Sequence, residues 1–573
     1  VGGTYQTADY MYQSAANGDL WNGRWGIMRT YKKPQSNLKT LGHVALHAAD
    51  LATLDEAALS YKEKLRAWEP RPLLEMPVES SLVKLEPEQE ETIQPSYEVD
   101  EKGRPVQERT VEYAMAYPEL MRQLDPDLVL DAEKLGWFGI KPARVDSCPR
   151  GSVVRYYRVS AIDAANWLPG GRLVYNDKHK IYDPDAILFA RDEYLSDLKS
   201  GLRQPEPLIL RARAGECVQV VLTNRLPTRL KKTPQWAHHS PISPNFNVNQ
   251  VAPSNHVSLH PQLVNYDVNT DDGANVGLNA LQTVPPGGRR VYRWYTGDFR
   301  SYRWFSTIRK GEITPVEYGI VNLRNMADVI NHGMHGGIGA LVIEPPDAVW
   351  STDPGTDAQA RVRFTAVDST VQTFRELVLL FQDDLGLHSD DATFWDTDGL
   401  NSGTALRNIK GVDDFQDTGL KAFNYRTEPL WARLGLPPQT APETLNDKDL
   451  GDILSSAAYG DPATPVFTAY AGEALRVRVG HPSGHGRQHA FALHGAEWYA
   501  NPWAVGAKSL RMGPNPSSFV LATQGGMSVM QSWNFVPEYG AGGRFGVTGD
   551  YLYRDLASFQ WSGGGLWGVF RVK

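Results

Sequence analysis

Two stretches of the chain repeat the same order of residues, and this repetition constrains the fold more than any other feature. Ala214-Gly-Glu-Cys-Val-Gln-Val220 and Ala471-Gly-Glu-Ala-Leu-Arg-Val477 each place a Gly-Glu turn between two apolar runs. Short apolar runs bounded by turn residues are typical of buried β-strands. Because each copy is followed by a stretch with paired histidines and then by a closing loop and strand, we expect two β-sandwiches built alike.

A second repeat joins the two ends of the chain. Asp9-Tyr-Met-Tyr12 precedes Trp25-Gly-Ile-Met-Arg29, and Asp550-Tyr-Leu-Tyr553 precedes Trp567-Gly-Val-Phe-Arg571. Each copy predicts a strand, a Gly-rich loop and a second strand. Since the second copy closes a domain, we expect the first to be the tail of a domain whose beginning lies elsewhere, on a second polypeptide or in a removed segment.

The composition favours a turn-rich β-protein. Among 573 residues there are 52 Gly and 38 Pro, which punctuate strands, and 16 Trp and 25 Tyr, which favour them. The net charge of −8 and the lack of a basic block argue against nucleic acid as a partner. No apolar run approaches the roughly 18 residues of a membrane helix, so no membrane span is expected.

Taken together, these features predict an all-β chain of tandem sandwiches with a partly helical insert. The insert carries the helix-favouring stretch 48–59. The two cysteines, Cys148 and Cys217, could form at most one disulfide, and the sequence does not show that they meet; Cys217 reads as a small buried hydrophobe inside a strand. The expected domains are 1–34 (an incomplete sandwich), 35–145 (the insert), 146–347 and 348–573.

Three histidine pairs are the candidate metal ligands: His256 and His260, His332 and His335, and His489 and His494. Residues at even spacing on a regular strand share a face, and residues at odd spacing do not. The first pair can therefore face one site. The last pair, on the predicted strand within 487–498, cannot do so unless a bulge intervenes.

Other polar residues are weaker candidates. Two histidine pairs stand in Gly-, Pro- or Ser-rich loops and are expected at the surface: His481 with His485, and His238 with His239. One pair in the insert, His43 and His47, is expected on an ordinary polar helix face. Three aspartates are either turn residues or ligands of a hard cation such as calcium or manganese: Asp267, Asp271 and Asp272.

The order of these elements resembles the cupredoxin domains of multicopper oxidases, and in particular the large multi-domain bacterial enzymes that include manganese oxidisers. The matching pieces are 214–224, 256–277, 332–345, 461–498 and 549–572. The resemblance implies tandem cupredoxin-like Greek-key sandwiches, copper as cofactor, histidine pairs as ligands of a trinuclear cluster, and a mononuclear copper held by one Cys and two His. It also implies a secreted protein, extracellular or periplasmic.

The chain departs from this pattern where the family carries His-Cys-His. The equivalent segment, 551–560, holds neither Cys nor His, and neither Cys148 nor Cys217 is flanked by His. One hypothesis is therefore a portion of an oxidase that couples one-electron oxidation of a metal ion or small phenol to reduction of dioxygen, with a second polypeptide completing it. The alternative is a cupredoxin-fold structural or binding subunit that has lost its copper.

Overall fold

The computed structural model describes the chain in segments. They are residues 8–14, 24–30, 98–99, 105–106, 147–149, 151–230, 253–277, 279–298, 314–329, 331–385, 387–391, 420–436, 449–484, 488–504, 511–556 and 564–573. The expected helix at 48–59 and the candidates His43, His47, His238, His239 and His485 lie outside these segments.

The first sandwich consists of two sheets that enclose one apolar core. The outer sheet has the order β12 (Asn265–Tyr266), β13 (Arg289–Tyr295), β10 (Cys217–Asn224), β5 (Val154–Asp163) and β8 (Ile187–Arg191). The inner sheet has the order β11 (His260–Pro261), β16 (Gly319–Arg324), β17 (Ile338–Glu344) and β9 (Leu208–Arg213).

The second sandwich repeats this plan around its own core. Its inner sheet has the order β18 (Val349–Thr352), β19 (Gln359–Thr365), β20 (Val371–Leu385), β24 (Leu475–Ser483) and β29 (Ser532–Phe535), with β22 (Leu420–Phe423) also paired to β20. Its outer sheet has the order β23 (Phe467–Ala469), β31 (Trp567–Val572), β30 (Gly549–Asp555), β25 (His489–Leu493) and β28 (Thr523–Met527).

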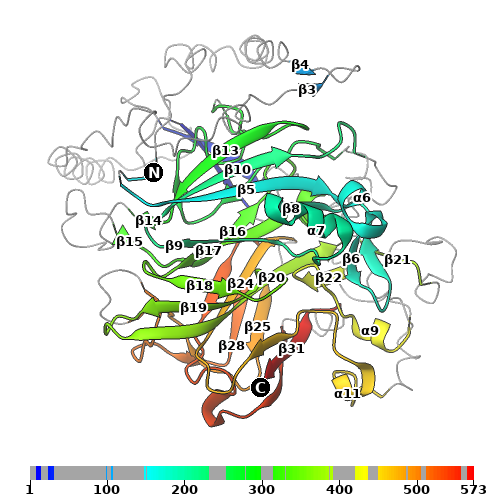
Figure 1. Ribbon diagram of the computed structural model, residues 1–573, viewed down its shortest axis with the longest axis vertical. Coiled ribbons are helices and arrows are strands. Elements are labelled where there is room, and N and C mark those ends of the chain that lie inside the picture. The colour runs from blue at the N-terminus through cyan, green and yellow to red at the C-terminus, as the bar shows by residue number, and fades with distance from the viewer. Residues whose placement is uncertain are drawn as a thin grey trace, which may run out of the picture.

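The four sheets stack as layers, and the two inner sheets face each other at the centre (Figure 1). Strands β16 and β17 of the first sandwich contact β24 of the second. The predicted all-β class with tandem sandwiches is therefore confirmed. No helix in the described segments is long and apolar enough to cross a membrane.

The remaining elements are short. The helices are α6 (Ala164–Trp167), α7 (Leu195–Ser200), α8 (Asn331–Met334), α9 (Leu430–Arg433) and α11 (Ser456–Tyr459). The small sheets are β1 (Asp9–Gln13) with β2 (Trp25–Arg29); β21 (His388–Ser389), β7 (Ile181–Asp183) and β6 (Leu173–Asn176); β14 (Gly297–Asp298) with β15 (Thr314–Pro315); β26 (Trp498–Tyr499) with β27 (Val520–Leu521); and β3 (Glu98–Val99) with β4 (Pro105–Val106).

Each repeated Gly-Glu turn crosses from one sheet of its sandwich to the other. Strand β9 pairs with β17 in the inner sheet, whereas β10, which follows the turn, pairs with β13 and β5 in the outer sheet. In the second sandwich the crossing runs in the opposite sense, because β23 belongs to the outer sheet and β24 to the inner sheet. The glycines, Gly215 and Gly472, have φ angles of 86° and 77°, a left-handed conformation that glycine adopts at little cost.

The terminal repeat is a hairpin built twice in the same register. Asp9 lies opposite Arg29 in β1–β2, and Asp550 lies opposite Arg571 in β30–β31. Both pairs are bidentate, with Nε–Oδ1 distances of 2.7 Å in each copy. The two copies differ in how far other strands bury them. The second copy is part of a sandwich, whereas β1 and β2 form a two-stranded sheet that leaves Trp25 52% exposed.

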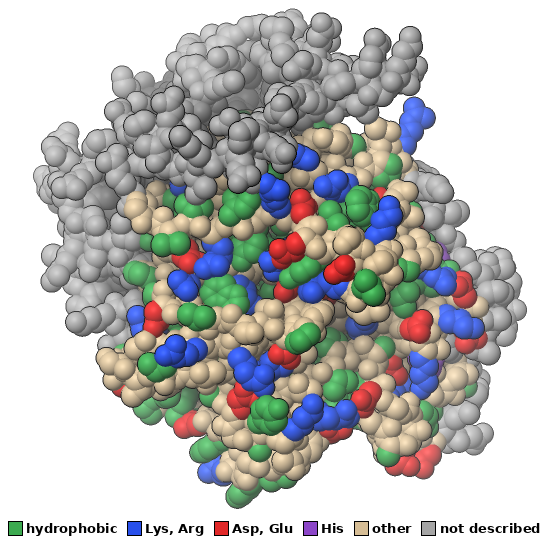
Figure 2. Space-filling model, in the orientation of Figure 1, with side chains coloured by type: hydrophobic (Ala, Val, Ile, Leu, Met, Phe, Trp, Pro, Cys, Tyr) green, Lys and Arg blue, Asp and Glu red, His purple; other side chains and the backbone are tan. Residues whose placement is uncertain are grey.

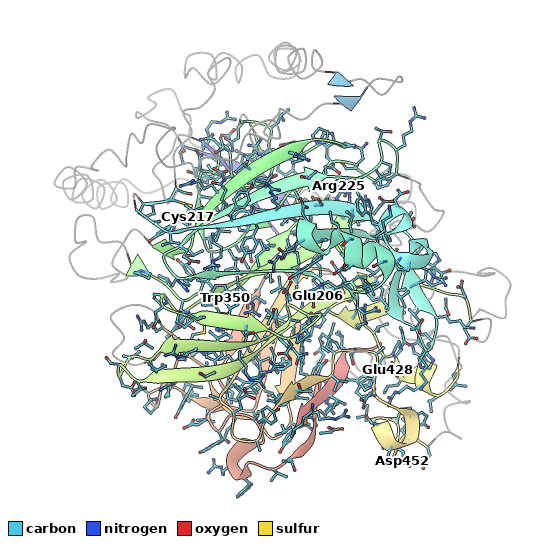
Figure 3. The ribbon with its side chains drawn as sticks, in the orientation of Figure 1. Glu206, Cys217, Arg225, Trp350, Glu428 and Asp452 are labelled. Atoms are coloured by element: carbon cyan, nitrogen blue, oxygen red, sulfur yellow. A yellow bond between two sulfur atoms is a disulfide. The ribbon has the colours of Figure 1, made fainter. Side chains whose placement is uncertain are left out.

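The two cysteines form a disulfide, which the sequence left open. Cys148 and Cys217 are joined, with their Cα atoms 5.6 Å apart, and both side chains are buried against Tyr295. Figure 3 labels Cys217 on the first sandwich. The bond links the segment before β5 to the start of β10, and so joins the beginnings of two neighbouring strands in the middle of the outer sheet.

Buried ion pairs join the two inner sheets. Arg211 of β9 donates to Glu344 at 2.8 Å, and it also pairs with Glu376 of β20. Glu376 in turn accepts from Arg478 of β24 at 2.7 Å. All four side chains are at most 3% exposed. The outer surface, by contrast, intersperses charges of both signs with apolar side chains on the face seen in Figure 2.

Candidate metal centre

The core of the second sandwich ends in polar side chains that continue the inward-facing rows of its strands. On β20 the row Leu377, Leu379 and Phe381 leads to Asp383, and all four side chains are buried. Because successive side chains on a strand alternate between faces, every second residue points into the core. On β24 the same alternation places the side chains of Val479 and then His481 in the inward-facing row.

The opposite sheet contributes its polar groups in the same way. His489 is the first residue of β25 and lies in line with the core residues Phe491 and Leu493. Asp555 is the last residue of β30 and follows Tyr553. Both polar side chains are no more than 1% exposed. The two sheets thus bring carboxylates and imidazoles together at one end of a dry apolar core.

Asp383, His481 and His489 form a cluster that could hold a metal ion. One ligand atom from each lies within 4.8 Å of the others, and it is the one such group of three His, Cys, Asp or Glu side chains found within the described segments. The two imidazole rings are 4.6 Å apart between centroids and meet edge to face at 77°. Nε2 of His489 lies 3.5 Å from Oδ2 of Asp383.

Asp555 fixes the orientation of His489. Its Oδ2 accepts a hydrogen bond from Nδ1 of the imidazole, and its Oδ1 accepts from the backbone N–H of Ala490 at 2.9 Å. This arrangement turns Nε2 toward Asp383 and His481. A carboxylate that holds one nitrogen of an imidazole while the other faces the metal is a recurrent support of metal-binding histidines.

His481 is a fully buried imidazole, and within the described part of the chain neither ring nitrogen has a hydrogen-bond partner of good geometry. Burial, with the neighbouring His489 acting in the same direction, holds the pKa of His481 well below its usual range, although Asp383 and the backbone of Ser483 oppose this. The ring is therefore neutral at physiological pH. A neutral imidazole with a free lone pair is the form that binds a metal ion.

The charges around the cluster are balanced. Lys421 of β22 places Nζ 2.7 Å from Oδ1 of Asp383, and both side chains are at most 1% exposed. Burial lowers the pKa of His489, but hydrogen bonds to Asp383 and Asp555 outweigh burial and raise it to about 9. Two carboxylates therefore face one ammonium and one imidazolium when no metal is bound.

Gly484 leaves room beside the cluster. A Cβ at this position would lie 2.8 Å from Nε2 of His481 and 2.8 Å from Cβ of Asp383. These distances are too short for a real side chain without movement of its neighbours. The donor set and the space next to it therefore fit a small metal ion, with Asp383, His481 and His489 as the ligands.

The first pair of predicted ligands lies in the first sandwich, away from this cluster. Nδ1 of His256 is 3.1 Å from the hydroxyl of Thr283. Nδ1 of His260 is 3.1 Å from Oδ1 of Asp272 and 2.8 Å from the backbone oxygen of that residue. Their role as metal ligands stays a prediction.

The second pair lies at the short helix α8 and is engaged with protein groups. His332 is 2.6 Å from Nδ2 of Asn325 through Nδ1 and 2.6 Å from the carbonyl of Ser254 through Nε2, so both ring nitrogens have partners. Nδ1 of His335 is 2.9 Å from Oδ2 of Asp183. This pair also stays a prediction.

The weaker aspartate candidates are engaged with protein groups. Asp267 accepts from the backbone N–H of Asn269 at 2.8 Å, which fits its reading as a turn residue. Asp271 instead accepts from the backbone N–H of Arg293 in β13 at 3.1 Å.

The end of strand β25 separates the two histidines of the third pair, His489 and His494. His489 is in the cluster, whereas His494 is exposed in the turn that follows β25. A register shift does occur, between His489 and Ala490, but it does not turn His494 inward.

One interpretation was wrong: His481 is not a surface loop residue but a buried residue of β24. Pro482 and Gly484 suggested a loop, whereas the alternation of Leu475, Val477 and Val479 predicts that position 481 faces the core. The same alternation could have identified Asp383 and Asp555, which the sequence reasoning missed.

Comparisons with known proteins give only distant likenesses. No protein-family model and no curated protein matches the chain. Similar solved structures include a multicopper oxidase (12% identity over 75% of this chain and 92% of that one, TM-score 0.36), a blue copper oxidase from Nitrosomonas europaea (14%, 73% and 86%, 0.36) and a copper nitrite reductase from Nitrosomonas europaea (13%, 73% and 94%, 0.37). Likenesses at these TM-scores carry no argument about ligands, substrate or partners.

Proposed function

We propose that the chain is a copper-binding oxidoreductase whose metal centre is formed by Asp383, His481 and His489. The observation that carries the proposal is the buried pair of imidazoles beside a carboxylate, in which His481 has no hydrogen-bond partner of good geometry among the described residues. The order of sequence elements, which resembles that of multicopper oxidases, favours copper over other metals.

The donor set suits copper in either oxidation state. Imidazole is a good ligand for copper, and a centre with two nitrogens and one oxygen accepts both the cuprous and the cupric ion. Copper would supply one-electron chemistry at this point of the core. The protein groups would do the rest: Asp555 orients His489, Phe381 packs 5.0 Å from the His489 ring and excludes water, and Lys421 offsets the charge of Asp383.

We propose dioxygen as the electron acceptor and a metal ion or small phenol as the donor. A single three-ligand centre transfers one electron at a time, whereas reduction of dioxygen to water takes four. Further copper ligands are therefore required, and the predicted pairs His256 and His260, and His332 and His335, are the candidates within this chain.

The alternative is a structural or binding subunit that has lost its copper. It is favoured by the ion pair between Lys421 and Asp383, which neutralises the cluster in the absence of metal. The two functions differ in a simple measurement, because only the oxidoreductase binds copper tightly and consumes oxygen.

The test is metal analysis of the full chain together with His481→Ala, His489→Ala and Asp383→Asn. We expect copper to be bound by the parent chain and each substitution to abolish or strongly reduce it, with oxygen uptake falling in parallel. His494→Ala is the matched control, since this histidine is exposed outside the cluster, and it should bind copper as the parent does. A folded parent chain that binds no copper would refute the proposal.

We propose further that the β1–β2 hairpin closes a third sandwich carried by another polypeptide. Residues Tyr12, Trp25 and Met28 are 63%, 52% and 41% exposed, whereas their counterparts in the β30–β31 hairpin, Tyr553 and Trp567 among them, are buried. The hairpin rests on the first sandwich through the buried Asp9 and through Met11, so the exposed side chains are the part of it that is left for a partner. Native mass spectrometry of the purified protein tests for such a second polypeptide, and loss of its binding in Trp25→Glu would locate the contact.

A further inference from the structure

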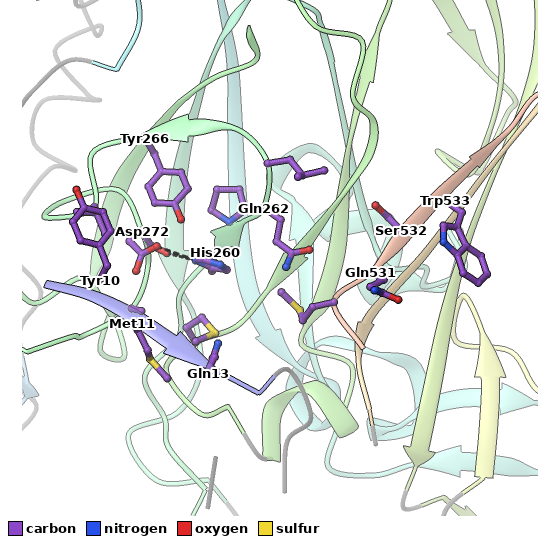
Figure 4. A pocket seen from close by; sticks show the side chains of 16 residues that line it. Tyr10, Met11, Gln13, His260, Gln262, Tyr266, Asp272, Gln531, Ser532 and Trp533 are labelled. Carbon is purple, nitrogen blue, oxygen red and sulfur yellow. Dashed lines mark hydrogen bonds and ion pairs between the residues drawn. The ribbon is translucent and has the colours of Figure 1, made fainter. Parts of the chain in front are cut away.

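A cavity outside the metal centre lies where three parts of the chain meet. It has a volume of about 560 Å³ and is lined by the β1 strand, by the loop around β11 and β12 of the first sandwich, and by the start of β29 of the second (Figure 4). Small-molecule sites in proteins commonly have this size and occur between domains. None of the three cluster ligands, Asp383, His481 and His489, lines it.

The cavity wall is rich in groups that both donate and accept hydrogen bonds. Gln13 and Gln262 contribute side-chain amides, which offer two donors and one acceptor each. Oε1 of Gln13 and the hydroxyl of Tyr10 are buried and have no hydrogen-bond partner within the described segments. Because these two atoms are closed to solvent, they lie behind the wall, and the polar groups available to an occupant are the other amide and imidazole atoms of the cavity.

The His260 imidazole is held in place at the same wall. Its Nδ1 is tied to Asp272, 3.1 Å from Oδ1, which leaves Nε2 as the remaining polar atom of the ring. The ring is only partly buried and contacts Tyr266 edge to face at 6.1 Å between centroids. Figure 4 shows His260 and Asp272 joined beneath Tyr266. His260 is thus a positioned hydrogen-bonding group.

The charge of the wall argues for a neutral occupant. Of the described residues that line the cavity, none is Lys or Arg, and Asp272 contributes a carboxylate. A phosphate or carboxylate ligand would find no cation other than His260, whose charge Asp272 already offsets. An ammonium ligand would find no carboxylate other than Asp272, which is engaged with that imidazole.

Aromatic side chains complete the wall. Tyr10, Tyr266 and Trp533 all contribute to it. Aromatic rings supply broad apolar faces, and the hydroxyl or N–H edge of Tyr and Trp adds a polar group. A ligand with one or two hydroxyls would leave most of the amides and hydroxyls here unpaired, which is costly. A ring with hydroxyls around its rim and C–H groups on its faces would satisfy both kinds of group.

We infer that this cavity binds a neutral polyhydroxylated ring, that is, a mono- or disaccharide. The inference goes beyond the proposed function and does not depend on the copper centre, because none of Asp383, His481 and His489 lines the cavity and the test uses the metal-free chain; His260 is the one residue shared with the candidate further copper ligands. It also gives the β1–β2 hairpin a role, since Tyr10 and Gln13 form one wall of the site.

The test is isothermal titration of the metal-free full chain with glucose, galactose, maltose and cellobiose, with catechol and inorganic phosphate as probes of the other ligand classes. We expect at least one sugar to bind saturably and catechol and phosphate to bind at least tenfold more weakly. Gln13→Ala and Gln262→Ala should each weaken sugar binding about tenfold, because each removes hydrogen bonds to hydroxyl groups.

The matched control is Gln372→Ala, which removes an exposed glutamine of β20 that is remote from the cavity and should leave sugar binding unchanged. Circular dichroism of each variant checks its folding, and either glutamine variant alone suffices if the other fails to fold. Absence of saturable sugar binding would overturn the inference. It would also be overturned by sugar binding that neither glutamine variant weakens, or by catechol or phosphate binding more tightly than every sugar.

Discussion

The substitution Asp555→Asn tests the metal centre without removing a proposed ligand. Asp555 accepts hydrogen bonds from Nδ1 of His489 and from the backbone N–H of Ala490, and all of its side chain is buried. Asparagine keeps the shape and one acceptor oxygen but loses the negative charge that orients the imidazole. Loss of such a supporting carboxylate typically lowers metal affinity about 10- to 100-fold. This corresponds to about 1.4 to 2.7 kcal/mol.

The burial of both partners makes the upper part of this range the expected result. Asp555 and His489 are each 0% exposed in their side chains, so neither solvent nor salt screens the interaction. The control is Asp550→Asn on the same strand, where the carboxylate is 41% exposed and pairs with Arg571. An exposed ion pair contributes little, and Asp550 is not part of the cluster.

The assay is competition for cuprous ion against a chromophoric chelator under anaerobic conditions. Asp555→Asn should release copper to about 10- to 100-fold less chelator than the parent chain requires. Asp550→Asn should match the parent. If Asp555→Asn holds copper as tightly as the parent does, the reasoning that places His489 on the metal through Nε2 is wrong.

Three further predictions follow from the described geometry. Replacing Cys148 and Cys217 by Ala opens a loop with a sequence separation of 69 residues, which by chain entropy lowers the free energy of unfolding by about 4 kcal/mol, measured as an earlier urea transition of the first sandwich. Gly484→Ala places a methyl 2.8 Å from Nε2 of His481 and should lower copper affinity, whereas Gly472→Ala, with nothing within 4 Å, should not, as read by the same chelator titration. Burial, with the neighbouring Glu376 acting in the same direction, raises the pKa of Glu344 from 4.5 to about 8, although Arg211 opposes this. The folded chain therefore keeps a proton that the unfolded chain loses, so urea unfolding at a series of pH values should show stability falling as the pH rises above the ordinary range of a glutamate, by at most about 1.4 kcal/mol per pH unit, and Glu344→Gln should remove this dependence.

The sequence predicted the layers well because strand patterns are local. The apolar runs around the two Gly-Glu turns located β9, β10 and β24 within a few residues. The sequence did not show that β9 and β10 belong to different sheets. Strand pairing is set by the packing of residues far apart in the chain, and a turn of the same composition can close a hairpin or cross between sheets.

The candidate site was harder to predict because its members are not neighbours in sequence. The sequence presents its histidines as pairs close in the chain, yet the cluster takes one residue each from β20, β24 and β25. His481 was assigned to the surface because proline and glycine follow it. The physical signal was present in the alternation, since each cluster residue occupies an inward position at the end of an apolar row.

The metal centre and the cavity are connected through the backbone, because the turn before β29 is hydrogen-bonded to His481 at the end of β24. The backbone N–H of His481 donates to the carbonyl of Gln531 at 3.0 Å, and the N–H of Met530 donates to the carbonyl of His481 at 2.6 Å. Met530 and Gln531 also line the cavity. Met530 has a φ of 66°, a left-handed conformation that a residue with a side chain adopts only when its surroundings hold it there. An occupant of the cavity that shifts this turn would move the backbone of His481. Since coupling between two binding sites is reciprocal, metal binding would then change the affinity of the cavity for its ligand by the same factor.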